Sequence, residues 1–146
     1  MLREVGVRKL AAVGALIGMV LLMGCLETRT FTKTNEGMRP MDLGSIGTVN
    51  ATNERYTVST ENAWYDIMSM PLNEDGVQYV LGLFSEMYSE GELDGRAVYF
   101  TYTDSERTNI NSIIWYDNGV LYLANSPAPE ANYDTLYALF KFYNGI

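Results

Sequence analysis

The clearest pattern of hydrophobic and polar positions is a β-hairpin within residues 109–125, NINSIIWYDNGVLYLAN. Two apolar runs, rich in β-branched and aromatic residues, flank Asn118-Gly119. This dipeptide favours a tight two-residue turn because both of its positions adopt positive φ. With these two residues as the loop, the register places Trp115 opposite Tyr122. The sequence therefore predicts two antiparallel strands joined by a two-residue turn.

Both faces of this hairpin are apolar. Successive side chains of a strand point to opposite faces, and the register sorts the residues into Ile113, Trp115, Tyr122 and Ala124 on one face and Ile114, Tyr116, Leu121 and Leu123 on the other. Either other layers of the protein sandwich the hairpin, or the face that carries Trp115 and Tyr122 is exposed to a partner.

Further strands are predicted before the hairpin. Arg96–Asp104, RAVYFTYTD, alternates like a strand and would complete a three-stranded meander. Arg55–Ser59 is a second strand candidate. Glu61–Met70 fits either a short helix or an extended segment.

Two helices bracket the meander. Asn73 is a good N-cap, and a glycine, Gly91, stands just past the predicted end of the first helix. Apolar residues recur at helical spacing along it: Val77, Val80, Leu81, Phe84 and Tyr88. The second helix is predicted from Pro129 or Glu130 to Asn144, with Gly145 as its stop.

The elements together favour an α+β fold. We expect a small antiparallel sheet, made of the three-strand meander plus one or two N-terminal strands, with two helices packed on one face. Residues 44–146 are long enough for one such domain and too short for two.

The N-terminus has the pattern of an export signal. Arg3, Arg8 and Lys9 precede the apolar segment Leu10–Met23, which is followed by Cys25, the only cysteine. The segment holds 14 residues, whereas a spanning helix needs about 20. An uncleaved signal anchor, with the apolar stretch extended through Leu26, is the alternative. Either way, the positive charges before the segment place the rest of the chain outside the cytoplasm.

Leu22-Met23-Gly24-Cys25 resembles the lipobox of prokaryotic lipoprotein precursors. The resemblance implies that residues 1–24 are a signal peptide and that Cys25 is acylated and becomes the new N-terminus. The protein would then be lipid-anchored in the cell membrane, facing outside the cytoplasm. The polar residues 25–43 are expected to form the lipidated cysteine and a flexible tether.

Charge narrows the class of partner. Residues 1–24 hold three of the ten basic side chains and one of the eighteen acidic ones, so seven basic and seventeen acidic groups remain, a net charge of −10. Nucleic-acid binding needs clustered Lys and Arg, and the basic residues here are scattered singly. We therefore expect no nucleic-acid partner, and the negative charge favours cationic ones.

The chain lacks several of the side chains that enzymes most often use for catalysis. The chain has no histidine, the commonest general base and metal ligand, and an acylated Cys25 cannot act as a nucleophile. We expect no catalytic residues, no cofactor and no metal site; the triplet Asp104, Ser105, Glu106 does not match an EF-hand loop. The carboxylates that would serve a polysaccharide hydrolase are Glu86, Glu90, Glu92, Asp94, Asp104 and Glu106.

Aromatic side chains are the best candidates for a binding surface, because they supply large amphipathic area at low entropic cost. The candidate interaction residues are Trp115, Tyr122, Ile113, Trp64 and Tyr65. The sequence thus predicts a lipid-anchored, non-catalytic interaction or accessory module of the cell envelope that binds an envelope protein or polymer. The alternatives are a lipoprotein that binds a small ligand or an envelope polymer and, further away, a carboxylate-based envelope hydrolase.

The lipoprotein prediction is tested at Cys25. Cys25→Ser removes the thiol that would be acylated, so the variant should lose both lipidation and signal cleavage. The measurement is the intact mass of the protein recovered from the membrane fraction, with Met38→Ser as a control substitution that leaves the lipobox untouched. Unchanged processing of Cys25→Ser would reject the lipoprotein prediction.

Overall fold

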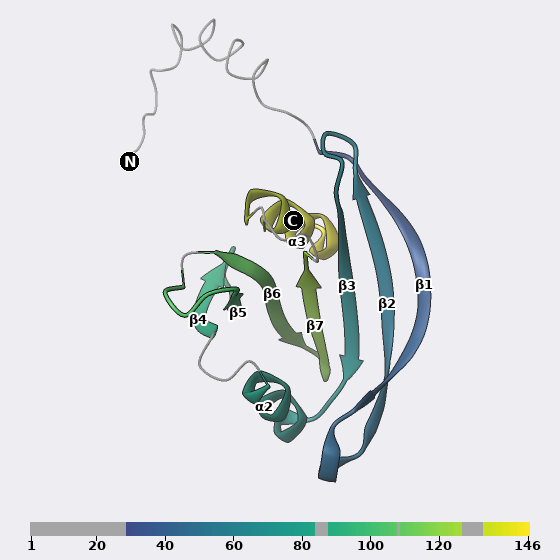
Figure 1. Cartoon of the computed structure of the whole chain (residues 1–146), viewed down its shortest axis with the longest axis vertical. Helices are drawn as coiled ribbons and strands as arrows, with labels where there is room; N and C mark the ends of the chain where they lie inside the picture. The colour runs from purple at the N-terminus through teal and green to yellow at the C-terminus, as the bar shows by residue number, and fades with distance from the viewer. Residues whose placement is uncertain (1–28, 84–87, 108, 127–132) are drawn as a thin grey trace, which may run out of the picture. The chain divides into compact units, whose positions relative to one another are not determined.

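Seven antiparallel strands form one sheet in the computed structural model of the chain, which describes residues 29–83, 88–107, 109–126 and 133–146 (Figure 1). Residues 31–146 make up one compact unit. The strands are β1 (Phe31–Asp42), β2 (Thr48–Val58), β3 (Trp64–Pro71), β4 (Tyr88–Leu93), β5 (Arg96–Tyr102), β6 (Ile110–Asp117) and β7 (Val120–Asn125). They lie in the order β1-β2-β3-β7-β6-β5-β4.

The predicted hairpin is confirmed as β6 and β7. Its register runs from Asp117 opposite Val120 to Ser112 opposite Asn125, with Trp115 opposite Tyr122. Asn118 and Gly119 both have positive φ, 51° and 78°, which is the conformation that this turn requires. The meander is confirmed as well, because β5 pairs with β6 and β6 with β7.

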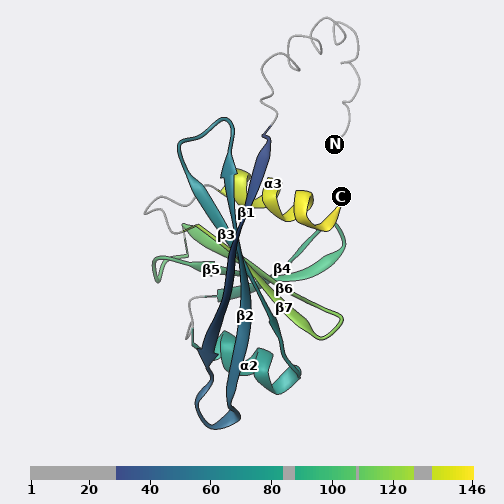
Figure 2. The same cartoon turned by 90° about the vertical axis from the view of Figure 1, so that its right-hand side faces the viewer.

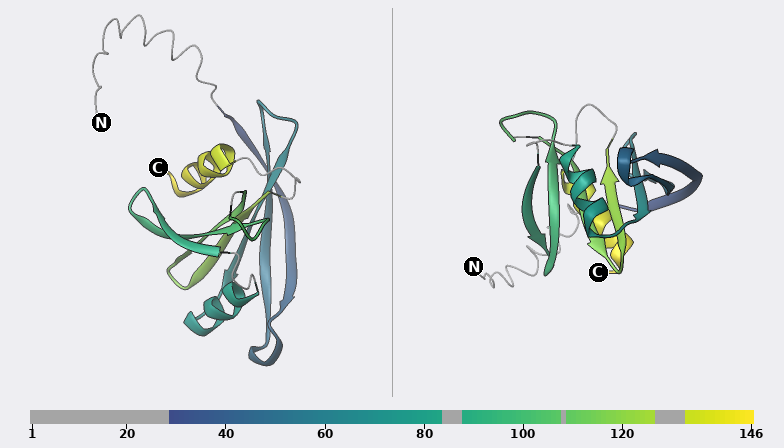
Figure 3. Two further views of the ribbon diagram at one scale, coloured as in Figure 1. Left: turned by 60° about the vertical axis from the view of Figure 1, so that its left-hand side comes forward. Right: turned by 90° about the horizontal axis from the view of Figure 1, so that it is seen from below.

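The two helices lie against opposite faces of the sheet, so the expectation that both pack on one face is wrong. Helix α3 (Tyr133–Asn144) covers the face of Trp115, and helix α2 (Glu74–Gly82) covers the face of Ile114. They also lie near opposite ends of the long strands β2 and β3 (Figures 2 and 3). Each helix therefore covers only part of its face.

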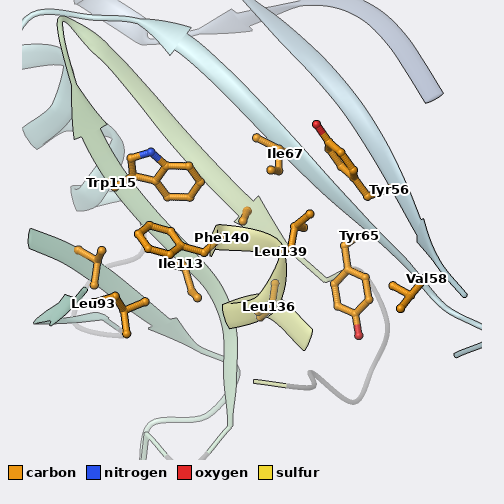
Figure 4. Close-up of a cluster of buried hydrophobic side chains, with 12 residues drawn as sticks. Tyr56, Val58, Tyr65, Ile67, Leu93, Ile113, Trp115, Leu136, Leu139 and Phe140 are labelled. Atoms are coloured by element: carbon orange, nitrogen blue, oxygen red, sulfur yellow. The ribbon is translucent and has the colours of Figure 1, made fainter. Parts of the chain in front are cut away.

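The larger core lies under α3. Leu136, Leu139 and Phe140 are fully buried against the sheet, and the Phe140 ring meets Trp115 edge to face, 4.9 Å between centroids (Figure 4). The rest of this cluster comes from six strands, β2 to β7, as Tyr56, Val58, Tyr65, Ile67, Leu93, Val98, Ile113, Trp115 and Ala124.

Polar contacts hold α3 at both ends. Near its start, Glu61 accepts hydrogen bonds from Thr135 and, at 3.1 Å, from Tyr65. Near its end, Arg96 donates to Asn144 at 3.2 Å. The predicted stop is confirmed: Gly145 has φ 69°, and its amide donates to Phe142. The predicted start at Pro129 or Glu130 lies outside the described residues.

Helix α2 begins as predicted and ends early. The side chain of Asn73 accepts a hydrogen bond from the amide of Gly76 at 2.9 Å, which confirms the cap. The helix ends at Gly82, and Tyr88 belongs to β4, so the predicted extent is wrong; Phe84 lies outside the described residues. A Cβ at Gly91 would lie 2.4 Å from the Phe100 ring, so this glycine serves close strand packing rather than a helix end.

The expected small sheet, a three-strand meander with one or two N-terminal strands, is wrong because three segments form strands that it omitted or left open. The first is β1, in the segment expected to be a tether, which pairs with β2 along its length and has few buried side chains. The second is β4, and the third is β3, which settles the ambiguous Glu61–Met70. A short 3₁₀ turn, η1 (Gly44–Ile46), joins β1 to β2.

The two tryptophans give a matched test of this architecture. Trp115→Ala leaves a cavity in the core under α3 and should lower the free energy of unfolding by about 3–5 kcal/mol. Trp64→Ala removes a half-exposed ring and should cost about 1 kcal/mol or less. Urea denaturation of residues 26–146, followed by circular dichroism, measures both. Equal losses would contradict the burial of Trp115 beneath α3.

Candidate binding surface

The face expected to meet a partner lies beneath α3. Ile113 is 0% exposed and Trp115 is 2% exposed, while Tyr122 is half-buried. The Trp115 and Tyr122 rings stack at 5.3 Å, with 13° between their planes. Of the two possibilities left open by the sequence, the structure has the hairpin sandwiched between helices. These three residues act as core rather than as surface.

Trp64 and Tyr65 are adjacent in β3 and therefore point to opposite faces of the sheet. Tyr65 is 2% exposed in the core under α3. Trp64 is 37% exposed and lies on the other face, which α2 covers only at its far end. Of the five candidate interaction residues, only Trp64 is therefore exposed.

A guanidinium group lies over the Trp64 ring. The Cζ atom of Arg55 is 3.6 Å from the ring centroid, a cation–π contact. The Nε atom of Arg55 also donates to Asp66 at 3.0 Å and lies 4.0 Å from a Glu36 oxygen. The hydrogen bond that Arg55 donates to Asp66 is the main cause that raises the pKa of Arg55. We call these four residues, Trp64, Arg55, Asp66 and Glu36, the Trp64 patch.

Strand register builds the Trp64 patch. Arg55 is directly opposite Asp66, and Thr57 is opposite Trp64, so Arg55 and Trp64 are diagonal neighbours. Both carboxylates hold the guanidinium in one place, which limits the side-chain entropy that a partner would have to remove on binding. The patch thus places one positive and two negative groups around one exposed aromatic ring.

The candidate carboxylates that the structure describes lie on β4, in the turn after it and in the loop after β5. Glu90 and Glu92 are exposed on β4, and Glu106 is exposed in the loop after β5. Asp94 lies in the β4–β5 turn and accepts hydrogen bonds from the Tyr137 hydroxyl at 3.1 and 3.3 Å. Asp104 accepts a long hydrogen bond from Asn109 at 3.4 Å. Glu86 lies outside the described residues.

A shallow hollow of about 300 Å³ lies on the α2 side of the sheet. Its lining combines two tyrosine rings with acidic groups from the first turn of α2: Glu74, Asp75, Val77, Gln78, Tyr99 and Tyr116. Burial raises the pKa of Tyr99, and the negative charge of Glu90 adds to the effect, so its phenol stays neutral at physiological pH. Carboxylates beside aromatic rings suit a cationic group.

Neither a metal centre nor a spanning helix is found in the part of the chain that the structure describes. Within those residues, no three Asp, Glu, His or Cys side chains are grouped so that they could hold a metal ion. Nor is any helix among them both long and apolar enough to cross a membrane. Cys25 and the signal pattern lie outside the described residues.

Comparison with protein-family models, curated proteins and solved structures finds no match to this chain. A function is therefore proposed from the residues of the chain itself.

The sequence analysis missed Arg55 and Asp66 because it did not pair β2 with β3. A signal was present: these opposite charges are equally distant from the polar turn Ser59–Asn62, as the observed register requires. The hollow was missed for a different reason. Its residues come from α2, β5 and β6, and only the crossover from β3 to the far edge of the sheet brings them together.

Proposed function

We propose that this protein is a lipid-anchored, extracytoplasmic interaction module of the cell envelope, without catalytic activity of its own. Acylated Cys25 holds it on the membrane, and the Trp64 patch contacts an envelope protein. The lipobox pattern supports the anchor. None of the candidate carboxylates that the structure describes lines the hollow beside α2, which favours a binding role over a hydrolytic one, because glycoside hydrolysis needs two carboxyl groups around a bound substrate.

One observation carries the assignment of the surface: Trp64 remains exposed while its ring is fixed by Arg55 at 3.6 Å. Tryptophan and arginine are the residues most enriched at the energetic centres of protein interfaces. Here they occur together, already ordered, on a part of the sheet that neither helix covers. A partner would lose little entropy in docking on them.

Crosslinking in intact cells tests this proposal. Wild type and an Ile46→Ala control, altered at an exposed apolar residue in η1, should capture the same partner, identified by mass spectrometry. Trp64→Ala should lose most of that capture while remaining folded and lipidated. Trp64→Phe, which keeps an aromatic ring under Arg55, should retain part of it. Equal capture by all four proteins would reject the Trp64 patch as the interface.

A second candidate function is the binding of a small cationic ligand, and the hollow beside α2 is the observation that favours it. Two tyrosine rings and two carboxylates line one open depression there. A lipoprotein that binds a small ligand was expected to hold it in a closed apolar pocket between the sheet and the C-terminal helix, whereas this hollow is open and lies beside α2.

Titration with choline, followed by NMR chemical shifts, tests the second candidate. Saturable shifts at Tyr99 and Tyr116 are expected, because a quaternary ammonium group is attracted to aromatic faces and carboxylates. Asp75→Asn should weaken binding several-fold. Glu92→Gln removes an exposed acid outside the hollow and should not. Shifts that do not saturate, or an equal loss in both variants, would reject a site in the hollow.

A further inference from the structure

The structure shortens the tether that the sequence suggested. Strand β1 begins at Phe31, so only residues 26–30 separate it from Cys25. A fully extended chain gains at most roughly 3.6 Å per residue, so Phe31 lies within about 20 Å of the Cys25 backbone. If Cys25 carries the lipid anchor, the start of β1 is held close to the bilayer surface.

The same end of the sheet carries an exposed aromatic patch. The ring of Phe142, in the last turn of α3, lies 5.3 Å from that of Phe31 and 6.2 Å from that of Tyr56. Phe142 is 54% exposed. Lys141 lies over the Tyr137 ring, and Lys33, beside Phe31 on β1, pairs with Glu54 at 3.1 Å, so the charge of Lys33 is balanced locally.

This combination differs from the rest of the surface. Single exposed apolar residues are common and need no explanation. Here, however, an exposed phenylalanine continues into a second ring at the strand end nearest the anchor. Aromatic residues favour the membrane–water interface, and the amine of Lys141, which lies over the Tyr137 ring, is attracted to anionic headgroups.

We propose that the C-terminal end of α3, with Phe142 at its centre, rests on the surface of the membrane that holds Cys25. This inference rests on the proposed lipid anchor. The α3 face of the sheet is then directed toward the bilayer. The opposite face, with the Trp64 patch and the hollow beside α2, is directed away from it and toward partners.

Site-specific labelling of the full, lipidated protein tests the orientation. Cys25 is the only cysteine, so once it is acylated an introduced cysteine is the one free thiol. An environment-sensitive fluorophore is attached in turn to Phe142→Cys, Ile146→Cys, Ile46→Cys and Thr57→Cys. The proteins are reconstituted into phosphatidylcholine–phosphatidylglycerol vesicles that contain a headgroup spin-labelled lipid, which quenches nearby probes.

The controls are matched by exposure and position. Ile46 is 48% exposed and follows β1, at the far end of a strand that spans roughly 40 Å. Thr57 is exposed at the same end of the sheet as Phe31 but on the opposite face. The probes at 142 and 146 should lose most of their fluorescence and shift to the blue. Those at 46 and 57 should lose little.

Each alternative result has a distinct meaning. Equal quenching at 142 and 57 would show a domain that moves freely near the surface, and stronger quenching at 57 would show the opposite orientation; either overturns the docking proposal and leaves the anchored module intact. If the mass of the purified protein shows no acyl chains on Cys25, both the proposed function and this inference fail. Urea denaturation confirms that each variant is folded.

Discussion

The β6–β7 hairpin has no polar face, and burying both of its faces requires a helix on each side. Ile113 and Trp115 need cover on one face, Ile114 and Leu121 on the other, and apolar burial is the main favourable term in folding. With no disulfide within the described residues, the sheet depends on this double cover. The turn at Asn118-Gly119 fixes the register, and a slip of one residue would exchange the two faces.

The two helices differ in length and position, and this difference determines which parts of the two sheet faces stay uncovered. Neither helix spans the long strands β2 and β3, so each face keeps an uncovered part. On the α2 face that part carries the Trp64 patch, where Arg55 and Asp66 pair across strands. The outer edge of β1 is also open, but a register shift between Asn35 and Gly37 and the imide nitrogen of Pro40 make it a poor template for another strand.

The features that could be predicted from the sequence are those that depend on residues close together in the chain. The hairpin turn, the cap at Asn73 and the stop at Gly145 depend on neighbouring residues, and all three are confirmed. Strand β1 could not be recognised, because an exposed edge strand needs no apolar alternation. Gly91 was misassigned since a helix end and a close strand contact both favour glycine, and only the position of Phe100 separates them. The covered face of Trp115 illustrates a further limit: an apolar strand face requires a partner, but the partner proved to be the same chain.

The length of chain between Cys25 and β1 limits how the domain can be oriented relative to the proposed anchor. A tether as long as residues 26–43 would let the domain turn freely, whereas five residues would leave the start of β1 beside the lipid headgroups if Cys25 carries the proposed anchor. At such short range, a modest preference of Phe142 for the interface would suffice to select an orientation, because the anchor would already have met the translational cost of bringing the surfaces together. The acidic hollow and the Trp64 patch share the face opposite α3, so the proposed orientation would present both of them away from the membrane. A domain held in this way would meet its partners with one defined face.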